Sequence, residues 1–194
     1  LRDAVAEDVP APQRLDRIVG LVARELRADV CSCFIQRAGE VIELFSTVGL
    51  PHDVVHQSKL RVGEGFIGDI AASAVPLVLA DMTTHPQFSL RPETGGADFR
   101  GFCGVPVLRA GHVRGVLVIQ NKLPRSYGPE VIDILETASM LVAELIVTGG
   151  IITRQELNSG TAGGGRPTVI EGVSLARGLR SEERRVGKEC RSRW

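Results

Sequence analysis

Charged and hydroxyl side chains gather at Asp81 and in the stretch 82–100, which has neither the period of a helix nor that of a strand. An arginine can bind an α-carboxylate through two parallel hydrogen bonds, and a carboxylate can bind an α-ammonium group. This combination predicts a site for a small zwitterionic molecule with an apolar floor. The candidate ligand-binding residues are Asp81, Arg91, Glu93, Thr94, Asp98, Phe99 and Cys103. The alternative is that they are solvated loop charges, turn formers and core residues.

The cysteines and histidines offer weaker chemistry. Cys31 and Cys33 are two residues apart on a predicted strand, so they share a face, and we expect core thiols rather than a redox or metal pair. His52 and His56 are four apart, but neither an acidic nor a thiol pair accompanies them, which favours surface histidines over a zinc site. The sequence therefore predicts no catalytic residue and no metal ligand.

Gly63, Gly65 and Gly68 match the G-x-G-x-x-G pattern of dinucleotide-binding folds, and Asp81 follows at a suitable distance. The segment before them, 58–62, is too polar for a parallel strand buried on both faces. The helix after them has room for only about two turns, and Glu64 would place a carboxylate where the pyrophosphate should lie. We therefore expect structural glycines that allow a tight turn and close helix packing.

Composition limits the class of protein. The 194 residues carry 23 basic and 23 acidic side chains, a formal net charge of zero. That balance gives no reason to expect nucleic acid or an anionic membrane as a partner. The apolar runs are far shorter than the roughly 20 residues that span a bilayer, and the sequence predicts a cytoplasmic protein.

Periodicity predicts the elements that must hold these residues. Apolar residues spaced as in an amphipathic helix run from Leu15 to Leu26 and again over 129–147. Between them we expect a short helix ending at Ser73 and strands at 31–36, 41–47, 59–62, 76–81 (buried), 104–108 and 113–121. A turn at 37–40 joins the first pair, and a four-residue connection at 109–112 joins the last. The fold class is α+β: a mostly antiparallel central sheet, flanked by an N-terminal and a long C-terminal helix, with one long ligand loop.

The chain divides by composition into five parts. We expect a flexible lead-in over 1–12 and the folded domain over 13–148. A glycine-rich linker follows over 149–166, because such a segment loses more backbone entropy than burial can recover. Some alternation returns over 167–180, as at the start of another domain, and 181–194 has the character of a non-native tail.

The pattern as a whole resembles a GAF domain, and in detail the N-terminal GAF domain of nitrogen-related phosphotransferase-system enzyme I. The resemblance covers about residues 12–150. It is carried by Val30-Cys31-Ser32, Gly63 to Gly68, Pro76 to Asp81, His85-Pro86 with Phe88, Arg91-Pro92-Glu93-Thr94-Gly95, Gly104 to Gly111, and Gly115 to Asn121. The pair Gly128-Pro129 departs from it, because a Ser or Thr helix cap is expected there.

The resemblance implies a function. It implies a regulatory domain that binds glutamine or a related nitrogen signal, in a parent that is a phosphoenolpyruvate-protein phosphotransferase using Mg²⁺. Partners would be the downstream phosphotransferase domains, starting near 167–180, and a phosphocarrier protein. The phosphorylated histidine of that family lies beyond this chain, so we expect neither phosphotransferase activity nor a cofactor here. Two alternatives stay open: a cysteine-based redox sensor or methionine sulfoxide reductase type of GAF domain, and a dimerisation module that forms a homodimer.

Overall fold

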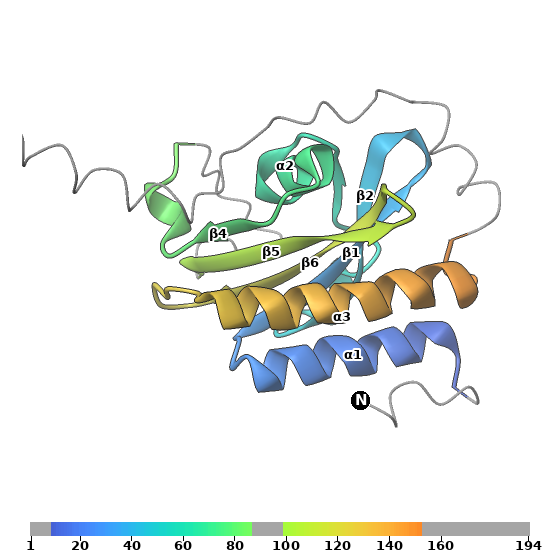
Figure 1. The fold of residues 1–194 in the computed structure, drawn as a ribbon, viewed down its shortest axis with the longest axis horizontal. Helices are drawn as coiled ribbons and strands as arrows, with labels where there is room; N and C mark the ends of the chain where they lie inside the picture. The colour runs from blue at the N-terminus through green and yellow to red at the C-terminus, as the bar shows by residue number, and fades with distance from the viewer. Residues whose placement is uncertain (1–8, 87–98, 153–194) are drawn as a thin grey trace, which may run out of the picture. The chain divides into compact units, whose positions relative to one another are not determined.

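The computed structural model describes residues 9–86 and 99–152, and Figure 1 shows their arrangement. Three helices, six strands and three short 3-10 turns follow one another along these residues. The helices are α1 (Ala11–Glu25), α2 (Gly65–Ser73) and α3 (Pro129–Thr148). The strands are β1 (Val30–Arg37), β2 (Val41–Val48), β3 (Lys59–Arg61), β4 (Leu77–Leu79), β5 (Gly101–Arg109) and β6 (His112–Asn121). The 3-10 turns are η2 (Ala38–Glu40), η3 (His52–Val54) and η4 (Met82–Thr84).

The six strands form one sheet in the order β3-β2-β1-β6-β5-β4, and all of its strand pairs are antiparallel. Helices α1 and α3 lie side by side on one face, and α2 covers the other (Figure 1). The α+β class and the mostly antiparallel sheet predicted from periodicity are therefore confirmed. An antiparallel sheet also excludes the dinucleotide-binding reading of the glycine motif, which requires parallel strands.

The face under α1 and α3 holds the larger core. Alternate residues of β1, β5 and β6 point into it because side chains in a strand alternate between its two faces. Its fully buried members include Leu15, Ile35, Leu117, Leu135 and Ile146. Leu15 and Leu135 come from the apolar stripes of α1 and α3, so both helices bury the faces that their spacing predicts.

The two ends of the folded region meet at this face. A Cβ atom built on Gly149, directly after α3, would lie 2.4 Å from Cβ of Ala11, the first residue of α1. Pro12 lies in the first turn of α1, where a proline loses no intrahelical hydrogen bond. Helix α1 therefore begins within the expected lead-in of residues 1–12.

The opposite face holds a second core beneath α2. Its buried members include Phe34, Ile70, Met82, Phe99 and Phe102. Gly104 of β5 allows α2 to approach closely, since a Cβ there would lie 2.6 Å from Cδ1 of Ile70. Contact between the helix and the sheet therefore depends on a glycine.

The glycine motif forms the turn between β3 and α2. Gly63 and Gly65 have φ values of 83° and 63°, a region that favours residues without a Cβ. At Gly68 a Cβ would lie 2.5 Å from the carbonyl oxygen of Arg61. These glycines serve a tight turn and close packing, as predicted.

Two local predictions were wrong. The strand expected at 76–81 spans only Leu77–Leu79 and is half-buried, because β4 is an edge strand. The connection between β5 and β6 has two residues, since Arg109 pairs with His112. Ala110 and Gly111 both have positive φ values, 51° and 78°, which is the geometry of the type I′ turn that suits a twisted hairpin.

None of the helices within 9–86 and 99–152 is both long and apolar enough to cross a bilayer. The predicted segments 167–180 and 181–194, and all of the linker beyond residue 152, lie outside the described residues.

Candidate functional site

The candidate site is built around the ends of the stretch 82–100. Asp81 precedes the turn η4 and Arg100 precedes β5, and the Nη2 atom of Arg100 donates a hydrogen bond to Oδ2 of Asp81. The backbone joins the same ends, because the N–H of Met82 donates to the carbonyl of Arg100 at 2.6 Å. The N–H of Arg100 in turn donates to the carbonyl of Asn121 at 2.8 Å. One ion pair and one backbone bond thus hold the two ends together, and the second backbone bond attaches Arg100 to β6.

The second oxygen of Asp81 is also bonded. Its Oδ1 accepts from the N–H of Thr83 at 3.1 Å and from the Thr83 hydroxyl at 2.6 Å, so it caps η4. These hydrogen bonds from Thr83, followed by the bond and charge of Arg100, lower the pKa of Asp81 below its ordinary value. Asp81 is therefore a carboxylate at neutral pH, next to a guanidinium whose side chain is 48% exposed.

An aromatic group includes two residues that are close in sequence to this ion pair, His85 and Phe102. The ring of Phe66, from α2, contacts His85 edge-on with 5.1 Å between centroids and contacts Phe102 at 5.5 Å. Phe99 and Met82, the neighbours of Arg100 and Asp81 in sequence, are buried in the same core as Phe102. A charged pair and an apolar surface thus occur together, as the binding of a small amphiphilic molecule requires.

The predicted site residues separate into three groups. Asp81 and Phe99 lie at the ends described above. Cys103 follows Phe102 on β5 and therefore points to the opposite face, where it is buried in the core under α1 and α3. The structure does not bring Cys103 to the other two. The remaining four, Arg91, Glu93, Thr94 and Asp98, lie outside the described residues.

The three cysteines between 31 and 103 are free thiols in one core. Burial raises the pKa of Cys33 and of Cys103 to about 12 and raises the pKa of Cys31 as well. Redox and nucleophilic chemistry uses the thiolate. The geometry therefore gives no support to a redox sensor built on these residues.

The histidines form no metal site among the described residues, which contain no group of three or more metal-ligating side chains. η3 ends at Val54, so His52 and His56 do not share a helix face. His56 bonds instead to Glu43, with 2.6 Å between Nδ1 and Oε1, and its ring contacts Phe45. Glu43 and Phe45 of this cluster belong to β2, which lies toward the opposite edge of the sheet from β4.

Sequence reasoning counted Arg100 among the charges of this stretch that suit a zwitterion but left it out of the final candidates, and it missed Phe66 and His85. The sequence carried a usable signal for Arg100, because it is the last charged residue before an apolar strand. The end of a loop must be anchored to such a strand. Phe66 and His85 are 19 positions apart in sequence, and only the packing of α2 against β5 brings them together.

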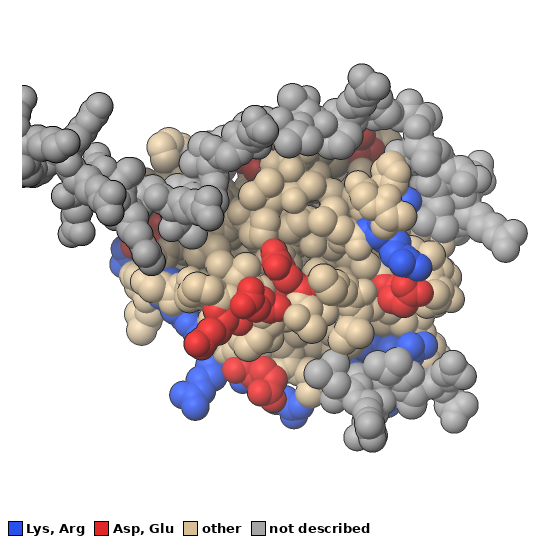
Figure 2. All heavy atoms as spheres, in the orientation of Figure 1, with Lys and Arg blue, Asp and Glu red and all other residues tan. Residues whose placement is uncertain are grey.

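Helix α3 presents an acidic outer surface. It carries Glu130, Asp133, Glu136 and Glu144 and no lysine or arginine. Figure 2 shows these acidic side chains gathered on one face of the molecule. Ile134 and Met140 lie among them and are 46% and 69% exposed.

Comparison with known proteins places this geometry in a family. A profile of the GAF domain matches residues 11–146. The Nif-specific regulatory protein of Herbaspirillum seropedicae is 32% identical over 88 residues, which are 44% of this chain and 16% of that protein. The phosphoenolpyruvate-dependent phosphotransferase system protein of Escherichia coli K12 is 29% identical over 113 residues, 56% of this chain and 15% of that protein. The chain thus spans about a sixth of the length of these relatives.

Two solved structures of GAF domains from phosphoenolpyruvate-protein phosphotransferases are similar to this chain in both fold and sequence. The GAF domain from an Acinetobacter phosphoenolpyruvate-protein phosphotransferase has a TM-score of 0.71 at 26% identity, covering 78% of this chain and 90% of that chain. The corresponding domain from Coxiella burnetii has a TM-score of 0.70 at 31% identity, covering 76% and 88%. The match of both sequence and fold over α1 to α3 means that this chain belongs to the GAF domain family and is similar, within it, to the GAF domains of phosphoenolpyruvate-protein phosphotransferases.

Proposed function

We propose that this domain is a small-molecule sensor that regulates a phosphoenolpyruvate-protein phosphotransferase. The observation that carries the proposal is the ion pair between Asp81 and Arg100, together with the aromatic group that His85 and Phe102, close to that pair in sequence, form with Phe66. The similarity to regulatory and phosphotransferase-system proteins supports it.

The proposed ligand is glutamine or a related amino acid. A zwitterion presents one carboxylate and one ammonium group, which match the guanidinium of Arg100 and the carboxylate of Asp81. Binding would exchange the bond between these two side chains for one bond from each of them to the ligand. The carbon chain of the ligand would lie against Phe66, which is only partly buried.

The parent protein, in this proposal, works in the cytoplasm and passes phosphoryl groups to a phosphocarrier protein with Mg²⁺ as its metal. Those steps belong to domains that follow the sensor. The contribution of this domain is a difference in ligand affinity between two states of the parent, because only such a difference can shift activity.

Thermal unfolding of the full chain in the presence of glutamine, 2-oxoglutarate, a cyclic nucleotide or NAD tests the proposal. A ligand at about 100 times its Kd should stabilise the folded state by about 2.7 kcal/mol. We expect glutamine to raise Tm and Arg100→Gln to reduce that rise clearly at the same glutamine concentration. If glutamine leaves Tm unchanged up to millimolar concentration, the ligand assignment is wrong.

We further propose that the domain forms a homodimer through α1 and α3. The exposed Ile134 and Met140 lie within the acidic surface of α3, and α1, beside it, ends near the exposed Arg24 and Arg27. In a dimer, the arginines at the end of α1 of one copy would face the acidic surface of α3 of the other copy. Light scattering should show a dimer that Met140→Glu dissociates and that Val75→Glu, an exposed control on the other side of the sheet, leaves intact. A monomer at every protein concentration would contradict the proposal.

A further inference from the structure

The side chain of Asn121, at the end of β6, is the centre of a buried hydrogen-bond network. Its Nδ2 donates to the carbonyl of Arg27 at 3.1 Å and to Oδ2 of Asp29 at 3.3 Å. Its Oδ1 accepts from Nη1 of Arg125 at 3.2 Å and from the hydroxyl of Tyr127 at 3.0 Å. The amide therefore has two donated and two accepted bonds, which is its full capacity.

The partners fix which way the amide points. Arginine donates only and a backbone carbonyl accepts only, so Oδ1 must face Arg125 and Nδ2 must face Arg27. An unpaired amide at this buried position would be costly. The network therefore has one satisfied arrangement, and a shift of one partner disturbs the others.

The network is bonded to both ends of the candidate site. The carbonyl of Asn121 accepts from the N–H of Arg100, and the N–H of Arg125 donates to the carbonyl of Ala80 at 2.9 Å. Ala80 precedes Asp81 directly. Arg100 is thus bonded directly to Asn121, and Asp81 is next to the residue that is bonded to Arg125.

Close contact between Tyr127 and Gly101 adds an independent connection. A Cβ on Gly101, directly after Arg100, would lie 2.7 Å from the Tyr127 hydroxyl. The side chain of Tyr127 therefore passes over the backbone of β5 at its first residue. A displacement of that backbone changes the room available to Tyr127.

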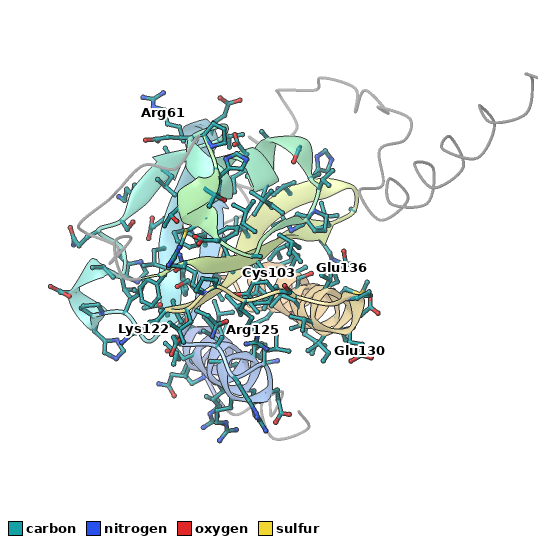
Figure 3. The ribbon with its side chains drawn as sticks, turned by 90° about the vertical axis from the view of Figure 1, so that its left-hand side faces the viewer. Arg61, Cys103, Lys122, Arg125, Glu130 and Glu136 are labelled. Atoms are coloured by element: carbon teal, nitrogen blue, oxygen red, sulfur yellow. The ribbon has the colours of Figure 1, made fainter. Side chains whose placement is uncertain are left out.

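The other side of the network holds two helix ends. Nη1 of Arg125 donates to the carbonyls of Leu26 and Arg27 at 2.7 and 3.1 Å, directly after α1, where a cation is favourable. Figure 3 shows Lys122 and Arg125 near this end of α1, and Glu130 at the start of α3. Tyr127 is two residues before α3, whose first turn has no side-chain cap of its own.

We infer that Asn121 is a positioning residue that couples the ion pair of Asp81 and Arg100 to the start of α3 and the end of α1. The biological purpose of this coupling rests on the proposed sensor function. Opening the ion pair shifts Arg100, and the shift reaches Tyr127 and Arg125 through their shared acceptor, Oδ1 of Asn121.

Hydrogen exchange of the full chain without any ligand tests the coupling. Asp81→Asn weakens the ion pair, and we expect it to speed exchange at residues 99–101 and, about threefold to tenfold, at residues 128–133. In the background of Asn121→Leu the first effect should remain and the second should vanish. Tyr127→Phe, which deletes one hydroxyl, should reduce the second effect even if Asn121→Leu fails to fold.

Ser32→Ala is the matched control. It removes another buried side-chain hydrogen bond, the 2.8 Å bond between Ser32 and Thr47, and should leave the response at 128–133 intact. The inference is overturned if Asp81→Asn does not affect 128–133 in the unmodified chain, or if the response is as large in Tyr127→Phe as in the unmodified chain. Since no ligand is present, a failed ligand screen would leave this result unaffected, and a failed coupling would leave ligand binding untouched.

Discussion

Arg100 and Arg109 lie at opposite ends of β5, and their side chains are equally exposed, at 48%. Each guanidinium pairs with one carboxylate: Arg100 with Asp81 on the candidate site, and Arg109 with Glu144 of α3 at 3.0 Å. The two arginines therefore differ in their surroundings and not in their exposure or pairing, so each is a control for the other.

Arg100→Gln should weaken glutamine binding about tenfold or more, because half of a charge-assisted contact is worth about 1.5–3 kcal/mol. Arg109→Gln should leave the affinity unchanged. Both variants should melt within a few degrees of the unmodified chain, since exposed ion pairs contribute about 0–1 kcal/mol. Calorimetric titration measures the affinities, and equal affinities in the two variants would remove Arg100 from the site.

Gly104→Ala should destabilise the domain by about 1–3 kcal/mol, because its Cβ would lie 2.6 Å from Cδ1 of Ile70 and force α2 away from the sheet. Gly20→Ala is the matched substitution. It lies within α1 with nothing within 4 Å of its Cβ, and should stabilise the fold by about 0.5–1 kcal/mol. Urea unfolding of both variants measures the change in the free energy of unfolding. If Gly104→Ala leaves that free energy unchanged, Ile70 repacks freely around the added methyl group.

The buried thiols should react slowly. In a Cys190→Ser chain, the aromatic disulfide reagent DTNB should label Cys31, Cys33 and Cys103 only as fast as the domain opens, because burial disfavours their thiolates. Unfolding in urea should expose all three thiols together and let DTNB label them rapidly. Rapid labelling of any one of them in the folded protein would revive the redox alternative.

Stability should fall in acid partly through Glu43. Partial burial raises the pKa of this carboxyl, but the hydrogen bond from His56 and the charges of Arg37 and Lys59 outweigh it, so its pKa lies below the ordinary value of 4.5. The folded state thus binds the proton less well than the unfolded state, and Glu43 stabilises the fold above the ordinary pKa.

That contribution is lost as the pH falls through the lowered pKa. Urea unfolding between pH 3 and 7 should show a shallower loss of stability for Glu43→Gln than for the unmodified chain. Curves of equal slope would show that Glu43 bonds as strongly when protonated.

Periodicity was sufficient for the elements with a long amphipathic pattern. Leu15 to Leu26 and the stripe through Leu135 specify helices that bury one face, and the apolar runs of β5 and β6 on either side of a turn specify paired strands. Periodicity failed where the burial of a strand depends on its position in the sheet. An apolar run such as 76–81 is expected to be buried, and whether it is central or at an edge depends on strand order, which a local pattern does not contain.

The site was harder to predict for the same reason. Asp81 and Phe99 could be proposed because Asp81 precedes an aperiodic stretch and Phe99 lies at its end. Phe66 and His85 could not, since their contact depends on how α2 lies on β5. Cys103 was grouped with Phe99 by proximity in sequence, yet Cys103 is one step along β5 from Phe102 and therefore points to the other face of the sheet. Asn121 carried a signal that was not used: it is a polar residue that ends an apolar strand, and burial makes it find partners.

The contact between Ala11 and Gly149 has a practical consequence for engineering. Because the first residue of α1 and the residue after α3 touch, a short glycine-rich bridge could join them and new termini could be opened between Ala110 and Gly111, in the exposed hairpin turn. Such a circular permutant would keep both cores and every strand pair. A reporter protein inserted at the same point would stand at one end of the sheet, next to the ion pair of Arg109 with Glu144 of α3.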